Sequence, residues 1–476
     1  MKTGRMIIAA GAAACAAAAI FGAAVAQDAE LTLHQKTQIA GHAAQFTCSA
    51  TFNAGRAFED IARSELEPVF VTRMLGGVAA AAPEINREAR FVAQSYDASM
   101  PPRYAVWRPH LGCVALPVGA DIAAAAHMPR IDLPDHREDG KALPWPQGDR
   151  DAFAPPLPAE ARARLDAAVA AAFDRKTYGE GSETTAVVIL QGGKIVAERY
   201  RDDFDMYTSQ RTWSVAKSVA ASVIGAAVEQ GIVDPRAPSG IPEWGSAADP
   251  RRVITLENLL HMSSGLWSLG NRTDFIYFGG GTVTQQAVSH PLEAPPGARW
   301  KYANNDTMLA IRALRAAMND DQRYLEFPFT DLFHKIGMNH TNPETDWQGN
   351  FVFSSQVWTT ARDLARLGLL YLHNGVWDGE RILPEWWAAY VATPAPSQPP
   401  RRGDGPARGY GAQFWLLGEF PGVPDDAYAM LGNRGQIVVI VPSRDAVIVR
   451  RGYDASGTGV RFSETSFAAA VLEALE

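Results

Sequence analysis

The heptapeptide Thr212-Trp213-Ser214-Val215-Ala216-Lys217-Ser218 decides how this chain is interpreted. Apolar residues recur after it at helical spacing, at Val219, Val223, Ala226 and Ala227. A serine and a lysine three residues apart then lie on one face of a helix, one turn apart. A serine hydroxyl is a weak nucleophile until a neighbour takes its proton, and an amine with a lowered pKa can do so. Ser214 and Lys217 are therefore a candidate nucleophile and base, with a helix-capping serine beside a solvated lysine as the alternative.

The first 26 residues have the features of a secretory signal peptide. Lys2 and Arg5 precede an alanine-rich apolar run over residues 7–25, and Ala24-Val25-Ala26 fits the small residues of a cleavage site. A transmembrane anchor is the alternative. We therefore expect an exported protein, periplasmic or secreted, without stable membrane insertion after cleavage.

Cysteine content and charge restrict the class further. Cys48 and Cys113 remain after removal of the leader, and an even pair in an exported protein predicts a disulfide, with two buried thiols as the alternative. The formal net charge of −8 argues against nucleic acid and anionic lipid surfaces as partners. Zinc-helix and phosphate-loop motifs are absent from the sequence, so we expect neither a metal nor a cofactor. The oligomeric state is left open.

Two proline-rich stretches divide the chain. Prolines between residues 129 and 158 predict an extended linker. It would join an N-terminal module of unknown role, residues 27–128, to a main domain, residues 159–476. The mature length of about 450 residues exceeds one ordinary domain. A second stretch, residues 394–408, predicts a surface loop.

Strand pairs are predicted at both ends of the main domain. Residues 185–190 and 194–200 meet at Gly192-Gly193, a hairpin signal, and residues 436–441 and 446–451 form a second pair. Much of the section between them has helical periodicity. Strand pairs that bracket helices imply one antiparallel sheet built from distant segments. The predicted fold class is α/β, of the α+β kind, with an antiparallel sheet flanked by helices.

Three short motifs accompany this pattern. They are Ser214-x-x-Lys217, Tyr302-Ala303-Asn304 and Gly432-Asn433-Arg434-Gly435-Gln436. In order and spacing they resemble the serine β-lactamase and penicillin-binding-protein superfamily. The branch most resembled has a tyrosine second motif and includes class C β-lactamases, family VIII esterases and 6-aminohexanoate-dimer hydrolases; residues 436–452 are similar to the last group. The resemblance covers residues 158–476 and implies a β-lactamase/DD-peptidase-like fold with a mostly helical subdomain.

The resemblance also implies roles for the matched residues. Ser214 would be the acylated nucleophile, and either Lys217 or Tyr302 would be the acylation base. Tyr302 would also pass protons to the leaving group, which requires the Lys217 cation to lower its phenol pKa from about 10. Asn304 would donate a hydrogen bond to the substrate or to Lys217.

The third motif would complete the site. The backbone N–H groups of Ser214 and Gln436 would form the oxyanion hole. Gly435 would leave space for the acyl group. Asn433 stands where related β-lactamases and peptidases carry a lysine for the substrate carboxylate, and Arg434 would lie at the rim on the opposite face. Esters or linear amides are therefore favoured over penicillins.

Aromatic residues surround the motifs in the sequence, and some of them would line an apolar cleft while others fill the core. They are Trp213, Trp267, Tyr277, Trp300, Trp358 and Trp415. Together these features predict an exported serine hydrolase that cleaves a small-molecule ester or amide through an acyl-enzyme on Ser214. A β-lactamase or D-amino-acid peptidase is the alternative within this class. A catalytically silent, penicillin-recognition-like binding module is the alternative from another class.

Overall fold

The computed structural model describes residues 31–476 except 80, 269–272, 402 and 456, so the predicted leader lies outside the described residues. A seven-stranded antiparallel sheet forms the centre of the main domain, in the order β12-β13-β14-β15-β16-β5-β6. Its strands are β5 (Thr184–Gln191), β6 (Lys194–Tyr200), β12 (Gly409–Tyr410), β13 (Trp415–Leu416), β14 (Tyr428–Gly432), β15 (Gln436–Val441) and β16 (Ala446–Gly452). Because β16 pairs with β5, the two predicted hairpins are neighbours in one sheet.

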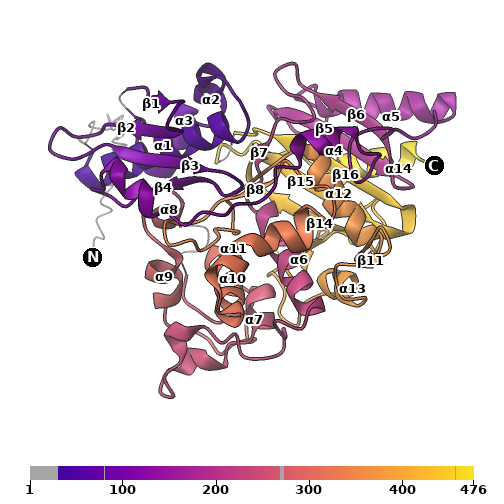
Figure 1. Ribbon diagram of the computed structural model, residues 1–476. Helices are drawn as coiled ribbons and strands as arrows, with labels where there is room; N and C mark the ends of the chain where they lie inside the picture. Colours follow the sequence, from indigo (N-terminus) through magenta and orange to yellow (C-terminus); the bar gives the residue numbers. More distant parts are fainter. Residues whose placement is uncertain (1–30, 80, 269–272, 402, 456) are drawn as a thin grey trace, which may run out of the picture.

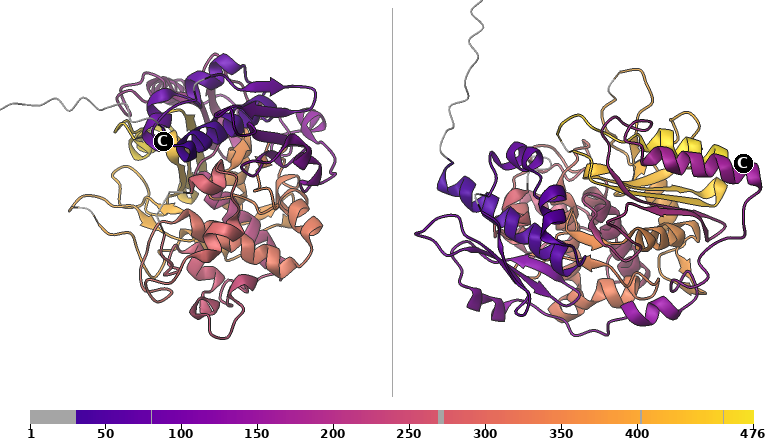
Figure 2. Two further views of the ribbon diagram at one scale, coloured as in Figure 1. Left: turned by 90° about the vertical axis from the view of Figure 1, so that its left-hand side faces the viewer. Right: turned by 90° about the horizontal axis from the view of Figure 1, so that it is seen from above.

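Helices cover both faces of this sheet. On one face, α5 (Ala159–Ala172) and α14 (Glu464–Ala474) pack on Val439 and on the other strand side chains that point to the same face as Val439 (Figure 1, Figure 2). On the opposite face, α6 (Val215–Glu229) and α12 (Ala361–Leu372) pack on Val438 and on the other strand side chains that point to that face. Burial of both faces explains the continuous apolar run of β15.

A mostly helical subdomain lies beside the sheet (Figure 1). Its helices include α7 (Leu256–Leu260), α8 (Asp274–Tyr277), α9 (Val283–Gln286), α10 (Asn304–Met318), α11 (Asp321–Pro328) and α13 (Trp387–Ala392). A small sheet, β7-β9-β8, joins Gln210–Arg211, Val357–Thr359 and Asn342–Pro343. The predicted α/β class, an antiparallel sheet flanked by helices with a helical subdomain, is confirmed.

The N-terminal module, residues 31–128, places helices against a four-stranded sheet, β1-β2-β3-β4 (Figure 2). Its elements are α1 (Leu33–Phe52), α2 (Phe58–Ser64), α3 (Pro68–Leu75), β1 (Glu84–Asn86), β2 (Phe91–Gln94), β3 (Arg103–Arg108) and β4 (Gly112–Ala115). The predicted disulfide between Cys48 and Cys113 is present and joins α1 to β4.

The proline-rich segment 129–158 is packed along the main domain and carries α4 (Arg137–Ala142). Trp145 is buried, and Arg366 of α12 donates hydrogen bonds to the carbonyls of Pro146 and Gly148. The segment therefore differs from a free linker, because buried arginine contacts hold its backbone. Among the described residues, no helix is both long and apolar enough to span a bilayer. Nor do the described His, Cys, Asp and Glu side chains gather in threes at a spacing suited to a metal ion.

Candidate active site

Ser214 stands at the N-terminus of α6, directly after a strained turn. Trp213 has a φ of 50°, a left-handed conformation that is unfavourable for a bulky residue. The Arg211 guanidinium lies 4.0 Å from the centroid of the Trp213 ring, and the N–H of Val215 donates to the carbonyl of Thr212 at 3.2 Å. The Ser214 side chain makes no hydrogen bond that caps the helix. The geometry therefore differs from that of a helix-capping serine.

Lys217 is buried one turn into α6, with 1 % of its surface exposed. Its Nζ lies 3.0 Å from Ser214 Oγ, 2.6 Å from Asn304 Oδ1 and 2.7 Å from the carbonyl oxygen of Ser354. The lysine is therefore not solvated. Burial, followed by the charge of Arg211, lowers the pKa of the Lys217 amine well below its usual range.

Tyr302 lies across the site from the helix. The Lys217 Nζ is 5.0 Å from the centroid of the Tyr302 ring. Burial of the phenol raises the pKa of Tyr302 well above its ordinary value, and a hydrogen bond with the Ser214 side chain opposes this shift only in part. We expected the Lys217 cation to lower this pKa. The structure gives the opposite direction, because desolvation is the larger effect and the buried amine favours its neutral form.

Asn304 begins α10 and connects two elements. Its Nδ2 donates to Thr273 Oγ1 at 3.2 Å, which directs its oxygen toward Lys217. Asn304 therefore accepts a hydrogen bond from Lys217, so the expected donation to Lys217 is wrong, while the expected donation to the substrate stays a prediction.

The third motif forms the turn between β14 and β15, where Gly432 pairs with Gln436. A Cβ atom at Gly432 would lie 3.1 Å from the backbone N of Ser214 and 2.4 Å from the carbonyl oxygen of Thr212. Only glycine allows the strand to approach the nucleophile so closely. A Cβ at Gly435 would lie 1.6 Å from a guanidinium nitrogen of Arg450. Gly435 thus makes room for an arginine, while the close approach to Ser214 occurs at Gly432.

Two side chains of this motif are buried. The Nε2 of Gln436 donates to the carbonyl of Gly452 at 2.6 Å, and its Oε1 accepts from Arg451 Nε at 2.6 Å. Arg434, expected at the rim, is 4 % exposed. We expected Arg434 at the rim because side chains along a strand alternate between its two faces. Arg434 lies in a turn, with a φ of 59°, so this alternation does not apply to it.

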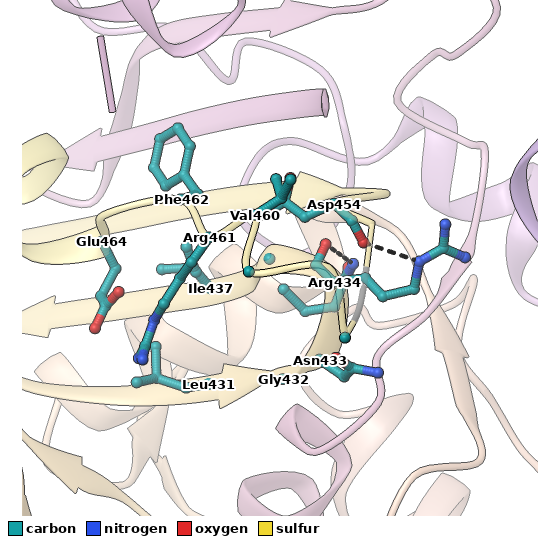
Figure 3. Close-up of a pocket in the computed structure, with 14 residues that line it drawn as sticks. Leu431, Gly432, Asn433, Arg434, Ile437, Asp454, Val460, Arg461, Phe462 and Glu464 are labelled. Carbon is teal, nitrogen blue, oxygen red and sulfur yellow. Dashed lines mark hydrogen bonds between the residues drawn. The ribbon is translucent and has the colours of Figure 1, made fainter. Parts of the chain in front are cut away.

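A pocket of about 370 Å³ adjoins the same turn (Figure 3). Asn433 lines it together with Gly432, and the remaining wall comes largely from residues 454–464. Ser214, Lys217 and Tyr302 are not among its lining residues. The pocket therefore lies beside the nucleophile and not over it.

Four aromatic rings gather beside the nucleophile, and we call them the aromatic wall: Trp300, Tyr302, Tyr410 and Trp415. The rings of Tyr302 and Trp415 stack with centroids 5.6 Å apart, and Tyr410 meets Trp415 edge-on at 4.9 Å. Trp300 and Trp415 are partly exposed. Of the aromatic residues selected from the sequence, only Trp300 and Trp415 belong to this wall.

Sequence reasoning missed two contributors to the site. The carbonyl of Ser354 accepts a hydrogen bond from Lys217, and the side chain of Arg211 supports Trp213. A backbone carbonyl leaves no signal in residue type. The only sequence signal for Arg211 was its position, because it is a cation two residues before Trp213, which directly precedes Ser214.

Comparisons with known proteins agree with this geometry. A family model described as Beta-lactamase matches residues 169–451. The 6-aminohexanoate-dimer hydrolase of Paenarthrobacter ureafaciens is 28 % identical over 326 residues, which are 62 % of this chain and 79 % of that protein. Among solved structures, a putative 6-aminohexanoate-dimer hydrolase from Bacillus anthracis has a TM-score of 0.52 at 22 % identity, covering 61 % of this chain and 78 % of that chain. A family VIII carboxylesterase has a TM-score of 0.50 at 14 % identity, covering 68 % and 98 %.

Proposed function

The chain belongs to the beta-lactamase family of serine hydrolases, and we propose that it is an exported enzyme that cleaves small esters or linear amides through an acyl-enzyme on Ser214. The observation that carries this proposal is the set of three contacts at the Lys217 amine. The composition of residues 1–26 supports export.

In this proposal Lys217 is the base that activates Ser214. A neutral amine has two N–H groups and one lone pair. The Asn304 oxygen and the Ser354 carbonyl are acceptors only, so they take both N–H groups. The lone pair is then left for Ser214, whose Oγ lies 3.0 Å from Nζ, and in this proposal the hydroxyl donates to the neutral amine. The lowered pKa of Lys217 supports this arrangement, because burial shifts the amine toward its neutral form.

Tyr302 then serves as the proton donor to the leaving group. Its raised pKa keeps the phenol protonated, and its hydrogen bond with Ser214 places it beside the bond to be broken. The Ser214 oxygen attacks the substrate carbonyl as its proton moves to Lys217. The tetrahedral intermediate collapses when the leaving group departs with a proton from Tyr302, and Lys217 returns its proton to the phenolate. Water repeats this sequence in the deacylation step.

The developing oxyanion would bind to the N–H of Ser214 and an N–H of the β14–β15 turn. The N–H of Ser214 lies at the start of α6, where backbone donors have no partner within the helix. Gln436 is the second donor that the family resemblance assigns, and it pairs with Gly432 next to Ser214.

The aromatic wall supports an apolar acyl or leaving group. Partly exposed indole rings beside Tyr302 suit a chain or ring without charge. Asn433 occupies the motif position of a carboxylate-binding lysine, which disfavours a requirement for an anionic substrate. The names of the relatives, a 6-aminohexanoate-dimer hydrolase and a carboxylesterase, agree with a linear amide or an ester.

A substrate comparison on purified mature protein tests this proposal. We expect hydrolysis of p-nitrophenyl butyrate and of a linear 6-aminohexanoate amide, and its loss in Ser214→Ala. Preferential cleavage of a chromogenic cephalosporin would instead support the β-lactamase alternative. No turnover and no covalent adduct with any substrate would support the silent binding module.

A further inference from the structure

We propose that the N-terminal module positions the oxyanion turn, residues 432–436, and that Arg434 is the positioning residue through which it acts. This inference rests on the proposed hydrolase function. The N-terminal module lies outside residues 169–451, the segment matched by the family model, whereas Arg434 lies inside that segment.

Arg434 joins three separate backbone segments. Its Nη1 donates to the carbonyl of Ser64 at the C-terminal end of α2, in the N-terminal module. Its Nε and Nη2 donate to the carbonyls of Asp454 and Tyr453, at 3.2 Å and 3.3 Å. Figure 3 shows the guanidinium directed away from the pocket, with its bond to Asp454 dashed. One buried side chain thus fixes the turn to the module and to the segment after β16.

The backbone of Arg434 explains why such a tether is needed. A φ of 59° is unfavourable for a residue with a side chain and persists only when the surroundings hold it. The helical part of this turn, Asn433–Gly435, is three residues long and immediately precedes Gln436. If the tether were lost, the turn would be free to relax, and the N–H groups beside Ser214 would move with it.

The module also holds the segment that supplies the other two carbonyls. The Tyr453 hydroxyl donates to Glu65 Oε1 at 2.7 Å and accepts a hydrogen bond from Arg56 Nη1 at 2.8 Å. Arg56 and Glu65 flank α2 and are buried. Two independent connections therefore run from α2 to the vicinity of the turn.

The same module supports the nucleophile from the other side. The Arg211 guanidinium lies 4.5 Å from the centroid of the Phe46 ring in α1 and 4.0 Å from that of the Trp213 ring, and the two centroids are 6.1 Å apart. The module thus contacts both the turn before Ser214 and the turn after Gly432. An oxyanion hole works only when its two donors keep a fixed separation. Because the N-terminal module contacts the turn before Ser214 and the turn after Gly432, it can hold the two donors at a constant separation.

Arginine variants test the tether directly. Arg434→Ala is expected to lower kcat for p-nitrophenyl butyrate at least tenfold, with KM changed less than twofold, because the oxyanion contact acts in the transition state. Arg434→Lys should recover part of the rate, since one ammonium can replace one of the three donors. Arg444→Ala is the control, since Arg444 is exposed in the next turn and pairs with Glu476. A folded Arg434→Ala enzyme with wild-type kcat would overturn the inference.

A second pair of variants changes buried side chains within the module. Ile61 packs on Ala50 and on Trp358 of the main domain, and Leu116 belongs to a cluster that contacts Trp347, so each variant loses one contact with the main domain. Ile61→Ala removes a buried side chain from α2, and Leu116→Ala removes a side chain of the same size from the packing around β3 and β4. Both should lower the melting temperature, but only Ile61→Ala should lower kcat, measured at a temperature where both proteins are folded. Equal kcat values in the two variants would contradict the inference. A wild-type protein without hydrolysis would instead contradict the proposed function, so the two failures are distinguishable.

Discussion

Lys217 Nζ lies 3.0 Å from Ser214 Oγ, while the Asn304 oxygen and the Ser354 carbonyl accept from the same amine. This relationship predicts the effect of removing the amine. Lys217→Met keeps the apolar stem and should leave the folded state intact, because the buried amine contributes little as a charge. We expect kcat to fall about 10²–10⁴-fold, the usual contribution of a general base. Lys194→Met, at the β5–β6 hairpin, is the matched control for loss of a lysine.

The pH dependence of kcat/KM reports the same amine. Below the pKa of Lys217 the amine is protonated and cannot take the Ser214 proton, so activity falls as the pH falls. Because burial lowers this pKa, the acid limb should lie well below the ordinary lysine value of about 10.4. The acid limb is measured from stopped-flow rates of ester hydrolysis between pH 5 and 10, at intervals of about one pH unit. A rate that kept rising tenfold per unit up to pH 10 would show that the amine is not neutral in the working enzyme.

Replacement of the phenol separates proton donation from packing. Tyr302→Phe keeps the ring that stacks on Trp415, so the fold and the aromatic wall should persist. In the acylation step, followed by single-turnover kinetics, alkyl esters, whose leaving alkoxide needs a proton, should lose about 10²-fold in rate. p-Nitrophenyl esters should lose less, because p-nitrophenolate departs without one. Equal losses for both leaving groups would assign Tyr302 a different role.

The close approach at Gly432 gives a steric prediction. Gly432 has a φ of −130°, which any residue can adopt, so Gly432→Ala would act only through its new methyl group. That methyl would lie 3.1 Å from the Ser214 nitrogen, and we expect a loss of about 10²–10³-fold in kcat, as when one oxyanion donor is removed. Gly405→Ala is the control, because Gly405 does not have a positive φ and a Cβ there meets nothing within 4 Å. Wild-type kcat in Gly432→Ala would show that the oxyanion hole lies elsewhere.

The sequence predicted the sheet and the disulfide because each follows from local signals. Short continuous runs of β-branched and aliphatic residues define β5 and β15, and an even cysteine pair defines the bridge. The direction of the Tyr302 pKa was not predictable, since desolvation depends on the aromatic wall assembled from segments more than 100 residues apart. The burial of Arg434 depends on α2, a helix 370 residues away in sequence.

The packing of segment 129–158 escaped prediction for a similar reason. Its prolines predict an extended linker, whereas residues 137–151 form α4 and a series of turns. Its burial depends on Arg362 and Arg366, which project from α12 and pair with Asp149. Composition alone cannot report a partner more than 200 residues away.

Covalent labelling tests the central claim most directly, that Ser214 is a nucleophile activated by Lys217. The mature protein is treated with a fluorophosphonate, and the intact mass and labelled peptide are measured by mass spectrometry. We predict one adduct per chain on Ser214, its absence in Ser214→Ala, and labelling at least a hundredfold slower in Lys217→Met. No adduct on the wild-type protein, or an undiminished adduct in Ser214→Ala, would contradict the account.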